Sequence, residues 1–185
     1  MQSLTPKISI VGCGNVGMRY AYATVIKGLA RELVLVDREF RQAEGHAMDL
    51  NHGAPYYAPV VIRAGSYEDI VDSDLVVVTA GIGGKVGQTR LDYATSNIKL
   101  FKEAIIPNLI KYAPHAIYLI VSNPVDVLSY ITYKLSDKPW QEVIGSGTVL
   151  DSARLRHQLS KSCHIDPRNI HAYILGEHGD SEFAV

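Results

Sequence analysis

Short runs of Val, Ile and Leu alternate along the whole chain with longer stretches whose apolar residues recur at helical spacing. The apolar runs lack strict polar alternation, which is typical of parallel strands that are covered on both faces. The runs that predict strands are Ile8–Val11, Leu33–Val36, Val60–Ile62, Leu75–Thr79, Ile117–Val121 and Val143–Ile144. The stretches that predict helices are Val16–Leu29, Gln42–Leu50, Tyr93–Tyr112, Val125–Leu135 and Leu150–Ser162. Because Pro107 lies inside the third of these helices, we expect a kink or a break there.

Composition narrows the class of protein. Of the 185 residues 47% are hydrophobic and 20% are charged, and the net charge is −1. This balance is typical of a globular chain and argues against partners such as nucleic acid or a membrane surface. No apolar run approaches the ~20 residues that span a bilayer, and residues 1–7 lack the features of a signal peptide. The two cysteines, Cys13 and Cys163, have neither disulfide-framework nor zinc-site spacing. We therefore expect a cytoplasmic protein without a bound metal.

A glycine-rich motif follows the first predicted strand directly and opens the first predicted helix. The motif is Gly12-Cys13-Gly14-Asn15-Val16-Gly17. In this position the first glycine permits a tight turn, the second lets backbone approach a pyrophosphate, and the third lets the helix pack on the strand. The N-terminus of the helix offers N–H groups to the anion. The motif predicts a dinucleotide site of the Rossmann type.

Asp37 ends the second predicted strand, 20 residues after Gly17. A carboxylate there accepts hydrogen bonds from both ribose hydroxyls and repels a 2′-phosphate, which favours NAD over NADP. Arg38 beside it is able to accommodate such a phosphate and keeps the alternative open. A plain βαβ unit with a glycine turn and a solvated Asp37 is the structural alternative to a cofactor site.

The fold that these patterns predict is a doubly wound α/β sheet of the Rossmann type. We expect an NAD-binding domain over residues 1–146. The glycines around Ser146 are typical of a domain boundary. Residues 147–185 are expected to begin a C-terminal catalytic domain that is truncated in this chain.

Four segments contain residues suited to catalysis. They are residues 81–92 (GIGGKVGQTRLD), 122–126 (SNPVD), 147–154 (GTVLDSAR) and 175–181 (LGEHGDS). In this order they resemble the L-lactate and malate dehydrogenase family, in which the first segment is the loop that covers the substrate. The resemblance extends over the whole chain.

The chemistry of these residue types alone, without the resemblance, fits the reduction of a 2-oxo acid by NADH. His178 is suited to proton transfer near neutral pH, and Asp151 is able to orient its ring and favour the imidazolium. Arg154, one helical turn after Asp151, has a planar fork that suits a carboxylate. Arg90 beside a glycine-rich loop is placed to polarise the carbonyl when the loop closes. Asn123 has an amide that can hold the substrate hydroxyl or the nicotinamide.

Each of these residues also has an ordinary interpretation. Asp151 and Arg154 fit a surface pair on a helix, Arg90 fits a solvated charge, and His178 alone fits a polar loop residue. The other histidines are interpreted as structural or surface residues, namely His46, His52, His115, His157 and His164.

The resemblance implies the same roles for the matching residues and adds others. It implies cofactor contacts at Ala80, Gly81 and Asn123, a cis bond before Pro124, and a homotetramer. Further implied positions are Gly84, which stands where the family discriminates substrates, and Arg156 and His171, which match a fructose 1,6-bisphosphate site of bacterial members.

Gly84 matches neither the glutamine of lactate dehydrogenases nor the arginine of malate dehydrogenases. Without a cation at this position a dicarboxylate has no evident partner, so the expected activity is that of an NAD-dependent L-lactate dehydrogenase. The alternatives are action on malate or a branched 2-hydroxy acid, and a non-catalytic NAD-binding fragment. Turnover separates the non-catalytic fragment from the lactate dehydrogenase and from the dehydrogenase of malate or a branched 2-hydroxy acid.

Overall fold

The computed structural model describes residues 5–83 and 90–185, with residues 90–93 described by their backbone alone. Six of its strands form one parallel sheet in the order β3-β2-β1-β4-β5-β6. These strands are β1 (Lys7–Val11), β2 (Glu32–Val36), β3 (Val61–Gly65), β4 (Leu75–Val78), β5 (Ile117–Ile120) and β6 (Val143–Gly145). The order reverses direction between β1 and β4, which creates the crevice where such sheets bind ligands.

Helices cover both faces of the sheet. The helices on the sheet are α1 (Asn15–Ile26), α2 (Phe40–His52), α3 (Arg90–Leu100), α4 (Ile106–Tyr112) and α5 (Val125–Ser136), whereas α6 (Val149–Cys163) lies beside it. Side chains of one strand alternate between two cores: in β4, Val77 packs with α1 and α2, whereas Val76 and Val78 pack with Phe101 and the α3–α5 side. This burial on both faces explains why the strands are mostly apolar.

The predicted strands and helices are confirmed within a few residues at their ends, and the helix changes type just before Pro107, where a kink or a break is expected. The helix does not break at Pro107. A π-helical turn, Phe101–Ile105, joins α3 to α4, and the backbone N–H of Ile106 donates to the carbonyl of Phe101. This wider turn changes the hydrogen-bond register just before Pro107, so that the missing N–H of proline is accommodated without a break in the helix.

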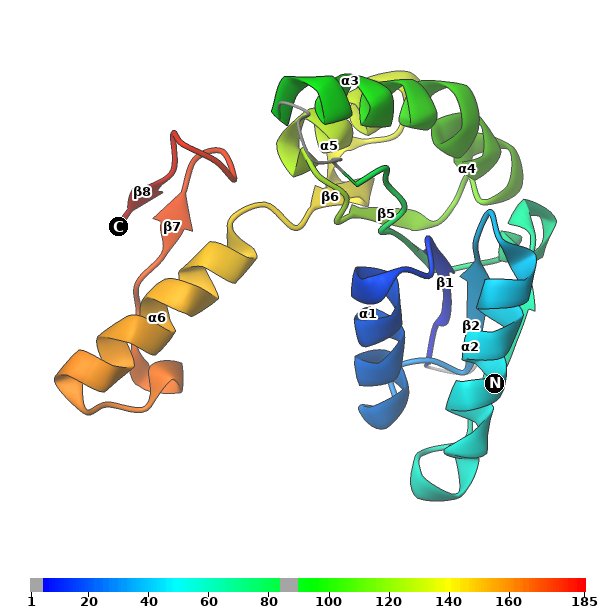
Figure 1. Cartoon of the computed structure of the whole chain (residues 1–185), viewed down its shortest axis with the longest axis horizontal. Helices are drawn as coiled ribbons and strands as arrows, with labels where there is room; N and C mark the ends of the chain where they lie inside the picture. The colour runs from blue at the N-terminus through cyan, green and yellow to red at the C-terminus, as the bar shows by residue number, and fades with distance from the viewer. Residues whose placement is uncertain (1–4, 84–89) are drawn as a thin grey trace.

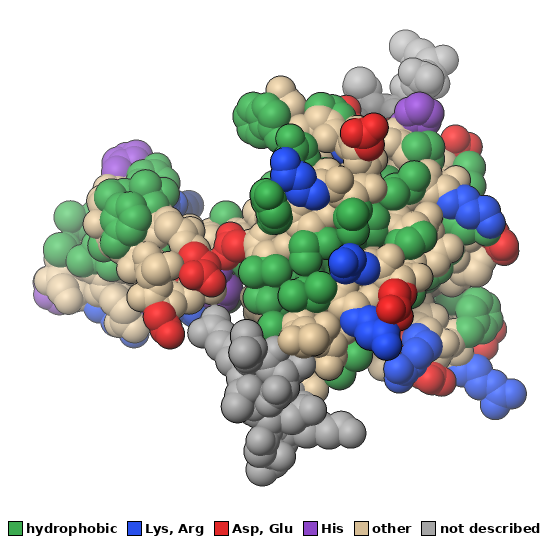
Figure 2. All heavy atoms as spheres, turned by 90° about the horizontal axis from the view of Figure 1, so that it is seen from above, with side chains coloured by type: hydrophobic (Ala, Val, Ile, Leu, Met, Phe, Trp, Pro, Cys, Tyr) green, Lys and Arg blue, Asp and Glu red, His purple; other side chains and the backbone are tan. Residues whose placement is uncertain are grey.

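Residues after β6 form a lobe beside the sheet (Figures 1 and 2). It consists of α6 and a small antiparallel pair, β7 (Ile174–Leu175) and β8 (Phe183–Ala184). Large apolar side chains of this lobe are exposed, among them Val149 and Leu150 on α6 and Phe183 on β8. The boundary expected after residue 146 falls between β6 and α6, and it stays a prediction.

No helix in the described part of the chain combines the length and the apolar character needed to cross a membrane.

A charge network closes the end of the sheet where the strands begin. The Lys7 ammonium donates to the carbonyls of Asp69 and Val71, at 2.9 and 2.8 Å. The Arg63 guanidinium pairs with both Glu32 and Asp69. The backbone N–H of Ser66 and then the Arg63 guanidinium hold the pKa of the Asp69 carboxyl below its usual value. The network therefore ties β1, β2 and β3 to the turn that contains Asp69.

The lowered pKa of Asp69 gives an acid limit to stability. Because its folded pKa lies below its unfolded one, the carboxylate stabilises the fold above about pH 4, and this contribution is lost as the pH falls through the folded value. We expect Asp69→Asn to lower the free energy of unfolding at pH 7 by about 1 kcal/mol or less, since solvent screens a carboxylate whose side chain is 37% exposed. Thermal melts between pH 7 and pH 2 should show a shallower acid decline in this variant. Asp49→Asn, at an exposed site on α2, is the control, and an equal effect there contradicts the assignment.

Candidate active site

The glycine-rich loop between β1 and α1 depends on the absence of side chains at two of its glycines. Gly12 has φ of +101°, and a Cβ there would lie 2.3 Å from the backbone nitrogen of Ala80. At Gly17 a Cβ would lie 2.0 Å from the carbonyl oxygen of Gly12. Gly14 differs, because nothing lies within 4 Å of the place its Cβ would occupy. Two glycines therefore allow close packing, and the third leaves open space where a ligand can approach.

A cavity of about 740 Å³ lies at the carboxyl ends of the strands, beside this loop. Such a volume is typical of sites for cofactors and drug-sized ligands. Its lining comes from the glycine-rich loop, the end of β2, the start of α2, the segments after β3 and β4, and the helical stretch from α3 to α4: Val11, Gly12, Gly14, Val36, Asp37, Arg38, Gln42, Ser66, Tyr67, Thr79, Ala80, Gly81, Ile82, Gly83, Leu100, Ala104 and Ile105. The cavity unites most of the predicted cofactor residues, while Asn15 and Val16 lie exposed at the start of α1.

Asp37 lines the cavity and also holds the glycine-rich loop. One carboxylate oxygen accepts from the backbone N–H of Cys13 at 2.6 Å, and the other accepts from that of Glu39 at 3.0 Å. A carboxylate oxygen has capacity for a second hydrogen bond, so ribose hydroxyls can still bind. Burial, and then the charge of Asp37, raises the pKa of the Cys13 thiol to about 12, so this cysteine stays protonated.

Hydroxyl groups connect the strand ends around the cavity. The Thr79 hydroxyl donates to the carbonyl of Gly12 at 2.5 Å. The Ser122 hydroxyl donates to the carbonyl of Ala80 at 2.6 Å. These two bonds join the ends of β1, β4 and β5. No role is predicted from the sequence for Thr79 and Ser122, because a hydroxyl at a strand end is common and carries no distinctive signal.

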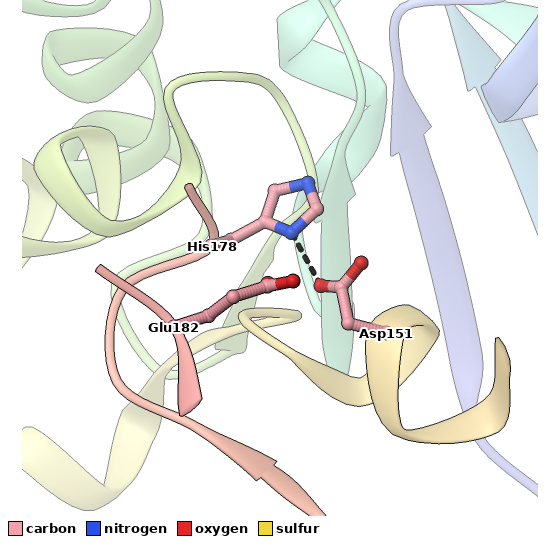
Figure 3. Close-up of side chains that lie close together, drawn as sticks. All are labelled: Asp151, His178 and Glu182. Carbon is pink, nitrogen blue, oxygen red and sulfur yellow. Dashed lines mark hydrogen bonds and ion pairs between the residues drawn. The ribbon is translucent and has the colours of Figure 1, made fainter. Parts of the chain in front are cut away.

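His178 and Asp151 come together from different elements of the C-terminal lobe. His178 lies in the loop between β7 and β8, and Asp151 lies in the first turn of α6. The His178 Nδ1 atom lies 2.5 Å from Asp151 Oδ2, and the other ring nitrogen points away from the carboxylate (Figure 3). Ser152 supports this pairing, because its hydroxyl accepts from the backbone N–H of Ile174 at 2.9 Å and so fixes β7 against α6.

The Asp151 carboxylate is almost fully buried, and it binds Arg154 as well as His178. Arg154 donates to Asp151 Oδ1 at 3.0 Å, while the Arg154 side chain is 63% exposed. Burial acts to raise the pKa of Asp151, but the hydrogen bonds and charges of His178 and Arg154 outweigh it and hold the pKa below its usual value. The carboxylate is therefore ionised at neutral pH, with most of the guanidinium fork of Arg154 left for another anion.

Asp126 is a residue of this site for which the sequence analysis proposed no role. Its Oδ2 atom accepts from the backbone N–H of His178 at 2.8 Å. The bond joins the first turn of α5 to the histidine loop, across 52 positions of sequence. An acidic residue in the first turn of a helix is ordinary, so no signal in the sequence distinguished Asp126. The bond places His178 close to the loop after β5, which carries Asn123.

Asn123 lies exposed at the end of β5, and its carbonyl oxygen accepts from the side chain of Asn97 at 3.0 Å. The peptide bond between Asn123 and Pro124 is cis, which confirms that expectation.

Glu182 lies next to the pair. One ligand atom from each of Asp151, His178 and Glu182 lies within 4.8 Å of the others (Figure 3). These atoms form a group of a kind that can hold a metal ion, but exposed acidic groups commonly lie near histidines without one. The expectation of a site without metal stays a prediction.

Comparisons with known proteins agree with this geometry. Residues 6–145 match the lactate/malate dehydrogenase NAD-binding domain, and residues 148–185 match the alpha/beta C-terminal domain of the same family. The chain belongs to the lactate/malate dehydrogenase family. It therefore contains an NAD-binding domain of this family.

Curated relatives include two L-lactate dehydrogenases. The protein from Clostridium botulinum (strain Loch Maree / Type A3) is 57% identical over 180 residues, which cover 97% of this chain and 56% of the relative. The protein from Thermoanaerobacter sp. (strain X514) is 54% identical over 178 residues, with coverage of 96% and 57%. The chain thus spans a little over half the length of these relatives.

Two solved structures are similar to the chain over nearly its whole length. A lactate dehydrogenase from a Medee basin deep-sea metagenome library has a TM-score of 0.92 and 50% identity, with 97% of this chain and 57% of that chain covered. The minor L-lactate dehydrogenase from Enterococcus mundtii, in its ligands-bound form, has a TM-score of 0.94 and 42% identity, with coverage of 98% and 58%. The Rossmann-type fold is thereby confirmed.

Four further residues are expected from the family, namely Gly84, Arg90, Arg156 and His171. Gly84 and the side chain of Arg90 fall outside the described residues. Arg156 is anchored on α6, where its Nε atom donates to the carbonyl of Ala172 at 2.9 Å and its guanidinium lies over the ring of Tyr173. His171, next to Ala172, is exposed. The segment that carries His171 therefore lies against Arg156.

The glycines of the loop give a matched pair of variants. We expect Gly17→Ala to destabilise the fold by about 1–3 kcal/mol, because the added carbon meets backbone. Gly14→Ala should leave the melting temperature nearly unchanged, because Gly14 has φ of −77° and open space, yet weaken NADH binding at least tenfold. Thermal melts and fluorescence titrations with NADH measure both effects. Unchanged NADH affinity in folded Gly14→Ala contradicts the assignment of this space to the cofactor.

Proposed function

We propose that the protein is an NAD-dependent L-lactate dehydrogenase that interconverts pyruvate and L-lactate. The observation that carries the proposal is the His178–Asp151 hydrogen bond, joined through Asp126 to the loop after β5. A proton-transfer pair thus adjoins the carboxyl edge of a sheet whose cavity fits a dinucleotide. The relatives at 57% and 54% identity are named L-lactate dehydrogenases, which supports the same activity.

The described residues fit NAD. The open space at Gly14 admits a pyrophosphate beside the N-terminus of α1. The Asp37 carboxylate accepts hydrogen bonds from ribose hydroxyls and repels the 2′-phosphate of NADP. Ala80 and Gly81 line the same cavity, and Asn15 and Val16 begin the helix that faces the pyrophosphate. When bound, the cofactor supplies the hydride that is added to the carbonyl carbon of the substrate.

Residues of this chain supply the proton and hold the substrate. With Nδ1 of His178 bonded to Asp151, the Nε2 atom carries the proton that passes to the carbonyl oxygen of the 2-oxo acid. The hydride and this proton together account for the two hydrogens of the alcohol. The exposed fork of Arg154 binds the substrate carboxylate, the Asn123 amide holds the oxygen that becomes the hydroxyl, and Arg90 polarises the carbonyl.

Substrate preference follows from position 84. A second carboxylate on the substrate, as in oxaloacetate, needs a cation, and Gly84 supplies none. Pyruvate is therefore favoured over oxaloacetate. Because glycine also leaves space, a branched substrate such as 2-oxoisocaproate is the alternative.

Assembly and regulation belong to the same proposal. Apolar side chains on α6 and β8 are exposed in this chain. Their exposure supports the proposal that this surface is buried against another protein chain, as in a homotetramer. Arg156 and His171 are proposed to bind the phosphates of fructose 1,6-bisphosphate, and the anchoring of Arg156 beside the His171 segment supports this. The proposed location is the cytoplasm.

A second candidate function is NAD binding without turnover by the 185-residue chain. The observation that favours it is the coverage of little more than half of the curated relatives.

The test is NADH oxidation with pyruvate, oxaloacetate and 2-oxoisocaproate, with and without fructose 1,6-bisphosphate. It uses the 185-residue chain and any longer protein that contains it. We expect pyruvate to be the best substrate, the bisphosphate to raise apparent affinity, and His178→Asn to lower kcat at least ~100-fold. His115→Asn, at an exposed position outside the site, is the control.

Each outcome separates the candidates. A preference for oxaloacetate, or full activity in His178→Asn, contradicts the proposed reaction. NADH binding without turnover in the 185-residue chain supports the second candidate, and the absence of turnover in the longer protein as well contradicts the proposed reaction. If fructose 1,6-bisphosphate changes neither the apparent affinity for the substrate nor the oligomeric state, only the regulatory part of the proposal is contradicted.

A further inference from the structure

Asn97 has a buried amide that bonds to two separate loops at the active-site edge. It lies on α3 and is 3% exposed. Its Oδ1 atom accepts from the backbone N–H of Ile82 at 2.6 Å, and its Nδ2 atom donates to the carbonyl of Ile82 at 3.3 Å. The same Nδ2 atom donates to the carbonyl of Asn123 at 3.0 Å. One planar group thus joins the segment after β4 to the segment after β5.

The chemistry of these three bonds requires an uncharged amide. The group must present one acceptor and two donors, and among common side chains only Asn and Gln do so. An aspartate would keep the acceptor and lose both donors, and it would bury a charge. Gly81 also packs on this amide, because a Cβ at Gly81 would lie 3.5 Å from Asn97 Oδ1.

The two joined segments serve one end of the proposed cofactor site. Gly81 and Ile82 line the cavity after β4, and Asn123 is the residue proposed to contact substrate and nicotinamide. The adenosine end is built differently, from Asp37 at the end of β2 and its bond to Cys13. Among the described residues, the Asn97 side chain makes its hydrogen bonds to Ile82 and Asn123 and none to that end. Its contacts therefore act on one half of the site only.

We propose that Asn97 is a positioning residue, which sets the separation of the β4 and β5 loops and so holds Asn123 against the nicotinamide half of the cofactor. The inference rests on the proposed function, since it takes the cavity as the NAD site. It assigns Asn97 no contact with the reacting atoms. Loss of the amide should therefore impair the nicotinamide half of the site and leave the adenosine half unchanged.

Two ligands distinguish this role from a merely structural one. ADP-ribose contains the adenosine, the pyrophosphate and the second ribose but lacks the nicotinamide, whereas NADH contains all of them. In the full 185-residue chain we expect Asn97→Ala to raise the Kd of NADH at least tenfold and that of ADP-ribose less than twofold. General loosening of the fold would weaken both ligands alike.

Asn51→Ala is the matched control. The Asn51 amide also donates to two backbone carbonyls, those of Ala47 and Ile62, at 2.8 and 2.9 Å. It joins α2 to β3 and lines neither loop. We expect its loss to lower the melting temperature without changing the ratio of the two affinities.

The results decide between the hypotheses. An equal loss of affinity for both ligands in Asn97→Ala, or no loss for either, overturns the positioning role while the proposed function stands. Failure of the unmodified chain to bind either ligand overturns both proposals. If Asn97→Ala does not fold, nuclear magnetic resonance of the unmodified chain replaces it. The side-chain amide signal of Asn97 should then shift with NADH and stay in place with ADP-ribose, and a signal that responds identically to both overturns the role.

Discussion

The close approach of three backbone segments at the carboxyl edge of the sheet is the constraint on which the rest of the site depends. The loop after β1 contacts both the segment after β4 and the start of α1, and a side-chain carbon at Gly12 or Gly17 would collide with backbone. The hydroxyl of Thr79 holds this contact from the β4 side. Because these segments are so close, the N-terminus of α1 faces the cavity, and Gly14 keeps open space in front of it. The shape of the proposed cofactor site follows from this packing.

The second part of the site comes from the lobe beside the sheet. Asp151 on α6 and His178 in the β7–β8 loop meet only because β7 is fixed against α6. The bond from the His178 backbone to Asp126 then connects the lobe to α5. Proton-transfer groups from one part of the chain are thereby held next to the cofactor edge of the other. This division agrees with the two family domains that match the chain.

Patterns that are local in sequence allowed much of this to be predicted. The strands were evident because burial on both faces makes them mostly apolar, and the glycine-rich loop was evident because its chemistry needs fixed spacing. The turn before Pro107 was not predicted, since a proline shows that a helical bond is lost but not how the chain compensates. The roles of Asn97 and Asp126 were not predicted for a different reason. Each acts through a hydrogen bond to a distant backbone segment, and such a bond leaves no pattern among neighbouring residues.

The cavity at this edge is proposed to bind NAD through Asp37 and the glycine-rich loop. Calorimetric titration of the 185-residue chain with NADH and with NADPH measures this binding. We expect one NADH per chain and at least tenfold weaker binding of NADPH, because the Asp37 carboxylate repels the 2′-phosphate. Equal binding of the two cofactors, or binding of neither, would contradict this proposal.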